Sequence, residues 1–117
     1  MNTFKCTDNS KILILNEKGQ GDIYSFNEIN SAFTKSLNRL KEIHNISGNA
    51  LARILKISQQ TLNLYENNKR TPNFITAIQI SNIFGVTVED MILDGLDLLE
   101  PDLEIISHYP QVIPNSD

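Results

Sequence analysis

Residues 46–72 read ISGNALARILKISQQTLNLYENNKRTP, with serines at positions 47 and 58. Ser47 and Ser58 each precede a run of helix-forming residues, and serine is a preferred N-cap because its hydroxyl accepts a bond from the first turn. The stretch therefore predicts a helix from Ser47 to Leu55, a tight turn, and a second helix from Gln59 to about residue 67. The side chains expected to be buried in these two helices are Leu51, Ile54, Leu55, Leu62 and Tyr65.

Helical periodicity continues on both sides of this stretch. Upstream, with Asn27 as the expected N-cap, apolar residues recur three or four positions apart and predict one helix that ends near Asn45; they are Ile29, Phe33, Leu37, Leu40 and Ile43. Downstream of Pro72, a fourth helix is expected to end at Gly85 as a left-handed C-cap, and to bury Phe74, Ala77, Ile78 and Phe84. A short fifth helix is expected from Thr87 to about Leu93, because the pattern breaks at Gly95.

Two short β-rich segments precede the helices. Residues 11–15 and 22–26 flank a polar turn with two glycines, which predicts a β-hairpin, and the first ten residues are expected to be unstructured. A hairpin of two strands is only marginally stable alone in water. This one is therefore expected to pack on a helix face, on the C-terminal tail or on another subunit.

The charge of the chain is distributed unevenly. The formal net charge is −4, but residues 35–73 carry seven Lys and Arg against two Glu, a balance of +5. Residues 74–117 carry eight acidic residues and no Lys or Arg. Because exposed charges act strongly only within about a Debye length, ~8–10 Å, the local balance matters more than the total. The asymmetry indicates a nucleic-acid-binding face and an acidic appendage.

Several classes of function find no support in the sequence. His44 and His108 have no partners at metal-ligand spacing, and there is no cysteine pair, Gly-rich phosphate loop or Ser–His–Asp arrangement. We therefore expect no catalytic, metal or cofactor site and no enzymatic activity. The first residues do not resemble a signal peptide, no apolar run approaches the ~20 residues that span a bilayer, and the single Cys6 agrees with a reducing compartment. A cytoplasmic protein without a membrane partner is expected.

The order of the elements resembles the Cro/C1-type (XRE-like, phage repressor) helix-turn-helix family over roughly residues 36–93. The resemblance is carried by the small Ala52 in the second helix, Ile57 and Ser58 in the turn, Glu66 closing the third helix, and a basic loop that ends at Pro72. It implies a mainly α fold: a five-helix lambda-repressor-like DNA-binding domain with a small N-terminal β-hairpin and an acidic C-terminal tail. The expected boundaries are 1–27 for the N-terminal extension, 28–94 for the domain, with the motif at about 48–67, and 95–117 for the tail.

The candidate DNA-binding residues lie on the third helix, in the loop after it and at the start of the second helix. Leu62 is expected to hold the third helix against the core, which turns its amides outward, and Gln or Asn amides can bond adenine in the major groove. The loop and the start of the second helix are expected to contact phosphates. The candidates are Ser47, Asn49, Gln59, Gln60, Thr61, Asn63, Leu64, Asn68, Lys69, Arg70 and Thr71. The resemblance also implies a structural ion pair between Glu66 and Lys41.

Four positions depart from the family's pattern. Gly48 stands where a Gln often opens the second helix, so that this contact is absent or is made by the backbone. Lys56 replaces the turn glycine; a positive φ there costs on the order of 1 kcal/mol, so the turn is either strained or reshaped. Asn68 replaces another glycine and tolerates left-handed geometry. Leu64 faces outward where polar residues are common, and it either contacts a thymine methyl group or packs elsewhere.

The resemblance implies a sequence-specific regulator of transcription that binds double-stranded DNA, namely a repressor that acts as a homodimer on a palindromic operator. The surfaces considered for the dimer are the hairpin, the fifth helix with Met91 and Ile92, and residues 103–106. One alternative is the antitoxin of a type II toxin–antitoxin pair, which binds a toxin through its appended segments and autoregulates its operon. Others are a regulator with a protein or peptide partner at the hairpin or the acidic tail, and an interaction module without DNA. The acidic tail also suggests autoinhibition, through competition with DNA for the basic face.

Overall fold

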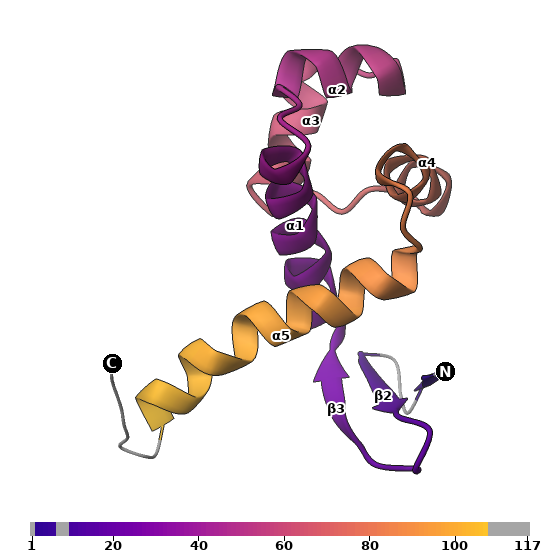
Figure 1. Cartoon of the computed structure of the whole chain (residues 1–117), viewed down its shortest axis with the longest axis vertical. Coiled ribbons are helices and arrows are strands. Elements are labelled where there is room, and N and C mark those ends of the chain that lie inside the picture. The colour runs from indigo at the N-terminus through magenta and orange to yellow at the C-terminus, as the bar shows by residue number, and fades with distance from the viewer. Residues whose placement is uncertain (1, 7–9, 108–117) are drawn as a thin grey trace.

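The computed structural model describes residues 2–6 and 10–107, with side chains up to residue 99. Within these residues a three-stranded antiparallel sheet precedes five α-helices, which confirms the mainly α fold. The elements are β1 (Thr3–Cys6), β2 (Lys11–Leu15), β3 (Gly21–Ser25), α1 (Phe26–Ile43), α2 (Gly48–Leu55), α3 (Gln59–Glu66), α4 (Phe74–Phe84) and α5 (Val88–Ser107). Figure 1 places α2 and α3 at one end of the long axis and the sheet at the other, with α5 crossing α1 between them.

Polar N-caps determine where the first four helices begin. Ser47 and Ser58 cap α2 and α3 as expected, each accepting a hydrogen bond from the backbone N–H three residues on. The prediction of Asn27 as the cap of α1 is wrong, since this residue lies inside the helix. Ser25 is the cap: its Oγ accepts from the Glu28 N–H at 3.1 Å, and Glu28 Oε1 accepts from the Ser25 N–H at 2.8 Å. This capping box satisfies two N–H groups that the start of a helix leaves unpaired.

Helix α5 is much longer than the sequence predicts. The expected end near Leu93 is wrong, because the helix continues through Gly95 to Ser107. Gly95 is buried against α1, and a Cβ added to it would lie 1.9 Å from the backbone oxygen of Ala32. The glycine therefore permits a close crossing of two helices and does not end one. The segment predicted as an acidic tail from residue 95 is thus helical over its first thirteen residues, and residues 108–117 lie outside the described part of the chain.

The expected hairpin is present, and a third strand joins it. β2 and β3 pair with Leu13 opposite Ile23, while β1 pairs with β2 so that Phe4 faces Ile14. The prediction that the first ten residues are unstructured is therefore wrong for β1. One face of the sheet packs on α1 and α5 in a small cluster formed by Ile14, Ala32 and Leu96, with Phe4, Ile12, Ile29, Tyr24, Ile92, Leu93 and Leu99 around it. The hairpin therefore uses two of its three expected supports, a helix face on α1 and, at Leu96 and Leu99, the segment predicted as the C-terminal tail.

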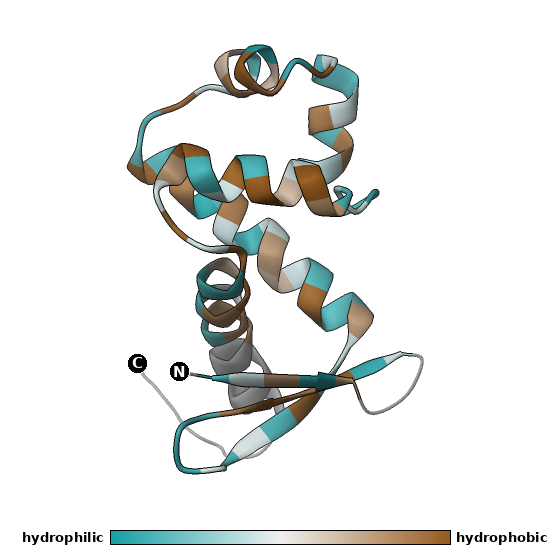
Figure 2. Cartoon of the chain, turned by 90° about the vertical axis from the view of Figure 1, so that its right-hand side faces the viewer, coloured by the Kyte–Doolittle hydropathy of each residue, from teal (hydrophilic) through white to brown (hydrophobic). Residues whose placement is uncertain are grey.

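A second and larger core joins the five helices. Its buried members are Phe33, Leu37, Leu51, Ala52, Leu55, Leu62, Tyr65, Ile80, Phe84 and Met91. Figure 2 shows hydrophobic and hydrophilic residues alternating along the helices, as expected for helices with one buried side. Three predicted core residues are instead exposed, namely Ile43 by 63%, Ile54 by 55% and Phe74 by 75%. Each lies near a helix end or on the side away from the core. Periodicity predicts which side of a helix is apolar, but it does not predict how far the neighbouring helices extend along that side.

Candidate nucleic-acid interface

Helix α3 presents a polar side at the surface and is anchored from beneath. Leu62 and Tyr65 are only 1% and 7% exposed, so they fix the helix against the core. Gln59, Gln60 and Asn63 are exposed on the same helix. A short helix held in this way presents its amides without any rearrangement, which is what groove reading requires.

The turn between α2 and α3 has a left-handed residue at Lys56, although the sequence offers no glycine there. Lys56 adopts φ 59° and ψ 41°, and its N–H donates to the Ala52 and Arg53 carbonyls of α2. The Ile57 N–H then donates to the Ala52 carbonyl at 3.1 Å. The turn is therefore not reshaped, and Lys56 carries the conformational cost of a non-glycine residue at positive φ.

The start of α2 lies beside the start of α3. Ser47 Oγ caps α2 by accepting from the Ala50 N–H at 3.1 Å, and both Ser47 and Asn49 are exposed. A Cβ placed on Gly48 would lie 3.8 Å from Gln59 Nε2. The first turn of α2 therefore lies close to the Gln59 amide, and also to the Glu66 carboxylate at the end of α3.

The basic loop after α3 is tied to that helix through its backbone. The N–H groups of Lys69 and Arg70 both donate to the Leu64 carbonyl, at 2.9 and 3.3 Å. The side chains of Lys69, Arg70 and Thr71 are exposed, and Leu64 itself is 38% exposed. The loop therefore holds two exposed cations beside α3.

Three other candidate residues have partners within the protein. Asn68 adopts φ 57°, and its Nδ2 donates to Ser31 Oγ at 2.9 Å while its Oδ1 accepts from Thr34 at 3.5 Å. The Asn68 side chain thus faces α1. Asn63 Oδ1 accepts from Asn67 Nδ2 at 2.9 Å, and the half-buried Thr61 accepts from Ser58 Oγ at 2.8 Å. Gln59 and Gln60 remain the two amides on α3 without a hydrogen-bond partner among the described residues.

A polar stripe on α1 supports α3 and the loop. The ion pair between Lys41 and Glu66 is present, as the resemblance implied. Asn38 Nδ2 donates to the Glu66 carbonyl at 2.9 Å, and Thr34 donates to the Tyr65 carbonyl at 3.4 Å. Sequence reasoning missed Ser31, Thr34 and Asn38, although with Lys41 they recur at helical spacing of three and four. These four polar residues form a stripe on a helix whose other side is apolar, and that pattern could have predicted a polar contact with a neighbouring element.

The comparison with known proteins bears on this arrangement. A family model described as Helix-turn-helix matches residues 37–91. An uncharacterized HTH-type transcriptional regulator of Methanocaldococcus jannaschii is 36% identical over 59 residues, which are 48% of this chain and 89% of the relative. The chain belongs to the helix-turn-helix transcriptional regulators. This confirms the Cro/C1-type resemblance, and the regulator is a DNA-binding protein of that family.

A solved structure supports the fold of the regulator independently of sequence. The clp gene regulator ClgR from Corynebacterium glutamicum superposes with a TM-score of 0.56 over 71% of this chain and 96% of that chain, at 19% identity. At this identity the likeness concerns the fold alone. It extends beyond the family match, since 71% coverage must include residues outside 37–91.

Most of the acidic residues in the C-terminal part of the regulator lie on helix α5. Of the eight acidic residues after residue 73, seven fall within α5 and only Asp117 lies beyond it. The first turns of α5 pack on α1, and Figure 1 shows the helix running away from α2 and α3. The suggested competition of the acidic segment with DNA stays a prediction.

Two further observations concern the part of the regulator that the structure describes. No three of its His, Cys, Asp or Glu side chains come together as a group that could hold a metal ion. None of its helices is both long enough and apolar enough to cross a membrane.

Proposed function

We propose that this protein is a non-enzymatic, sequence-specific repressor whose homodimer reads a palindromic operator. The observation that carries the proposal is the pair of exposed, unpartnered amides of Gln59 and Gln60 at the start of a helix whose Leu62 is 1% exposed. A glutamine amide bonds adenine N6 and N7 in bidentate fashion in the major groove. Neither relative's description favours the antitoxin alternative.

Each side chain of the interface then has a role set by its place. Gln59 and Gln60 read base edges, with Asn63 beside them through its Nδ2 group. Leu64 meets a thymine methyl group from its exposed side. The phosphate contacts come from the loop and from the start of α2, and the residues proposed for them are Ser47, Asn49, Lys69, Arg70 and, through its backbone N–H group, Thr71. Asn68 positions this loop on α1, through the bonds to Ser31 and Thr34 described above.

The dimer is proposed because one eight-residue helix covers few base pairs. Apolar residues recur along α5 at intervals of four, three, four and three, at Ile92, Leu96, Leu99, Leu103 and Ile106. The first three pack on the sheet, and the spacing continues past it in the pattern of a helix-to-helix seam. We propose that the last turns of α5 pair with a second copy. Met91, considered earlier for the dimer, is 1% exposed and belongs to the core.

The proposed organisation is an N-terminal extension over residues 1–27, a DNA-reading domain over residues 28–94, and a dimerisation segment beyond residue 94.

Sedimentation equilibrium of Leu103→Asp in the full chain tests the proposed pairing of the last turns of α5, with the adjacent Asp102→Asn as control. The expected result is a dimer for the parent and the control and a monomer for Leu103→Asp. A monomeric parent would contradict the proposed dimer.

Selection of bound DNA from random duplexes tests the proposed function as a whole. The expected outcome is a palindrome whose half-sites lie about one helical turn, ~34 Å, apart. Transcription in vitro from a promoter that overlaps the selected site should then decrease when the protein is added. Failure to enrich any sequence would contradict sequence-specific binding, and stimulated transcription would contradict repression.

A further inference from the structure

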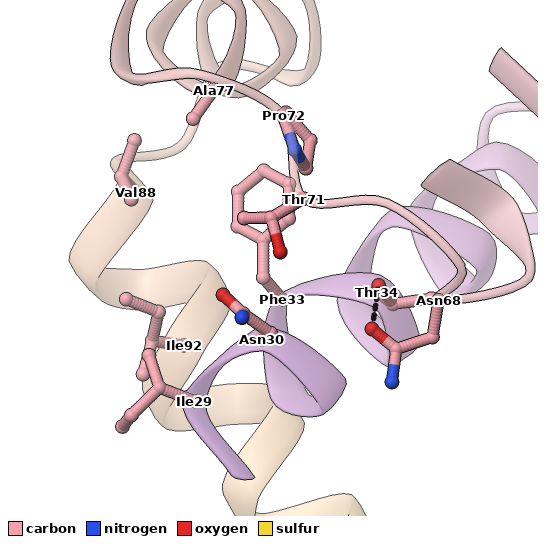
Figure 3. Close-up of a pocket in the computed structure, with 10 residues that line it drawn as sticks. All are labelled: Ile29, Asn30, Phe33, Thr34, Asn68, Thr71, Pro72, Ala77, Val88 and Ile92. Carbon is pink, nitrogen blue, oxygen red and sulfur yellow. Dashed lines mark hydrogen bonds between the residues drawn. The ribbon is translucent and has the colours of Figure 1, made fainter. Parts of the chain in front are cut away.

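A small cavity lies directly beneath the basic loop. It has a volume of about 150 Å³, is bounded by α1, α4, α5 and the loop that joins α3 to α4, and opens to solvent on one side (Figure 3). A volume of this size accommodates a six-membered ring. Nothing in the groove-reading role described above makes use of it.

The lining of the cavity defines the chemistry of what it can hold. Ile29, Phe33 and Ile92 make its walls apolar, and no charged side chain lines it. Asn30 and Thr71 also line it, and Figure 3 shows the amide and the hydroxyl turned toward the same space. A charged ligand would be desolvated there without a counter-charge, whereas a neutral ring with one polar oxygen fits both kinds of wall.

Some of the polar side chains that line the cavity already have hydrogen-bond partners within the protein, and others do not. Thr34 and Asn68 are bonded to each other, and Asn68 is also bonded to Ser31. Among the described residues, neither Asn30 nor Thr71 makes a side-chain hydrogen bond, so an amide and a hydroxyl remain available to a guest. A hydroxyl or carbonyl oxygen on the ligand would satisfy them.

The cavity is linked to the DNA-binding surface through the chain itself. Lys69 and Arg70 lie between two lining residues, Asn68 and Thr71. The backbone N–H groups of Lys69 and Arg70 donate to the Leu64 carbonyl, and the next two residues, Thr71 and Pro72, line the cavity. A guest that fills the space adds contacts only when the loop is docked. Phosphate contact by the two cations requires the same docked loop, and two ligands that favour one conformation bind cooperatively.

We infer that this cavity binds a neutral, single-ring molecule bearing one hydrogen-bonding oxygen, and that the bound molecule acts as a corepressor by holding the loop in place. The corepressor half of this inference rests on the proposed function, and the ligand-binding half does not. The site, its ligand class and its coupling all follow from the lining of one cavity and its place under residues 68–72.

Titration of the full-length protein with phenol, followed by ¹H–¹⁵N spectra, tests the site. The expected result is a set of saturable shifts at lining residues Thr71 and Ile92 and at Lys69 and Arg70. Benzene should bind several-fold more weakly, and benzoate should cause no saturable shift. An absence of saturable shifts with phenol, or binding of benzoate as tight as that of phenol, overturns the inference.

Substitutions locate the ligand within the cavity. Ala77→Leu projects a larger side chain into the space and should abolish phenol binding, whereas Gln79→Leu adds the same side chain on the exposed side of α4 and should leave it unchanged. Thr71→Val keeps the shape and removes the hydroxyl, so phenol should then bind only as well as benzene. If both Ala77→Leu and Thr71→Val bind phenol as the parent does, the cavity is not the site. Thr71→Val alone decides this if Ala77→Leu does not fold.

The coupling is measured with the duplex obtained by selection. Saturating phenol should tighten its binding at least about fivefold in the parent and not in Ala77→Leu. Unchanged affinity in the parent overturns the corepressor half. A protein that binds phenol but no duplex would refute the proposed function and leave the ligand site standing, so the two failures are distinguishable.

Discussion

Lys56 occupies a backbone conformation that suits glycine, at φ 59°. We predict that Lys56→Gly raises the free energy of unfolding by about 1 kcal/mol, because the Cβ no longer opposes the left-handed turn. Asn45 also has a positive φ, of 55°, but asparagine tolerates it, so Asn45→Gly should change stability by less than about 0.5 kcal/mol. Urea denaturation followed by circular dichroism measures both. A gain no larger at Lys56 than at Asn45 would show that the turn carries no strain.

Gln59 and Gln60 are expected to contribute to sequence recognition and not to folding. Replacing either with alanine should weaken binding of the selected duplex by about 1–3 kcal/mol, or roughly 5- to 150-fold, since a bidentate contact is lost. The thermal midpoint should stay within about 2 °C of the parent, because both side chains are exposed. Gln79→Ala, on the exposed side of α4, is the matched control. Fluorescence anisotropy gives the affinities, and equal binding by all four proteins would remove the two glutamines from the interface.

Single residues also show where prediction from sequence stops. Ser47 and Ser58 were predictable as caps because a cap depends on bonds within three residues. Asn68 was not predictable as a support, since its partners Ser31 and Thr34 are more than thirty positions away. Phe74 was assigned to the core because it lies on the apolar stripe of α4, yet the described residues leave its side chain 75% exposed.

Replacing glycine with alanine should have opposite effects on stability at Gly95 and Gly48, because the two residues contact different neighbours. Gly95→Ala should lower the free energy of unfolding by about 3 kcal/mol, because the new Cβ would overlap the backbone of Ala32 and force α1 and α5 apart. Gly48→Ala is the control. Its Cβ would lie 3.4 Å from the movable end of Glu66, and a better helix former should raise stability by up to about 0.5 kcal/mol.

Chemical denaturation of both variants distinguishes a helix crossing from a helix end. If Gly95 merely ended a short fifth helix, alanine would be accommodated there and the two variants would behave alike. The same contact explains why the length of α5 could not be predicted. A glycine is a sound stop signal in isolation, and only the backbone of α1, more than sixty positions earlier in the chain, shows that here it serves close packing.

Charge is separated along part of the molecule. The +5 segment of residues 35–73 contains α2, α3 and the loop, but also the end of α1, where Arg39 lines one pocket with Asp94 and Asp97 of α5. The sequence predicted this asymmetry in full because it depends only on composition by segment. It did not predict that the negative charge is held away from α3 by a helix, since that depends on the α1–α5 crossing.

The salt dependence of the binding constant can show how many subunits place the basic loop on the phosphate backbone of the duplex. Each neutralised phosphate of B-DNA contributes about −0.9 to the slope of log K against log salt. If Lys69 contacts one phosphate in each subunit of a dimer, Lys69→Gln should flatten the slope by about 1.8, whereas a monomer would lose only about 0.9. Lys18→Gln, in the exposed turn between β2 and β3 at the far end of the molecule, carries the same charge change and should leave the slope unaltered. Binding isotherms between about 50 and 200 mM salt are sufficient for the comparison. Equal slopes for the Lys69 and Lys18 variants would mean that the loop does not touch the phosphate backbone, and a loss near 0.9 would mean that a single subunit reads the DNA.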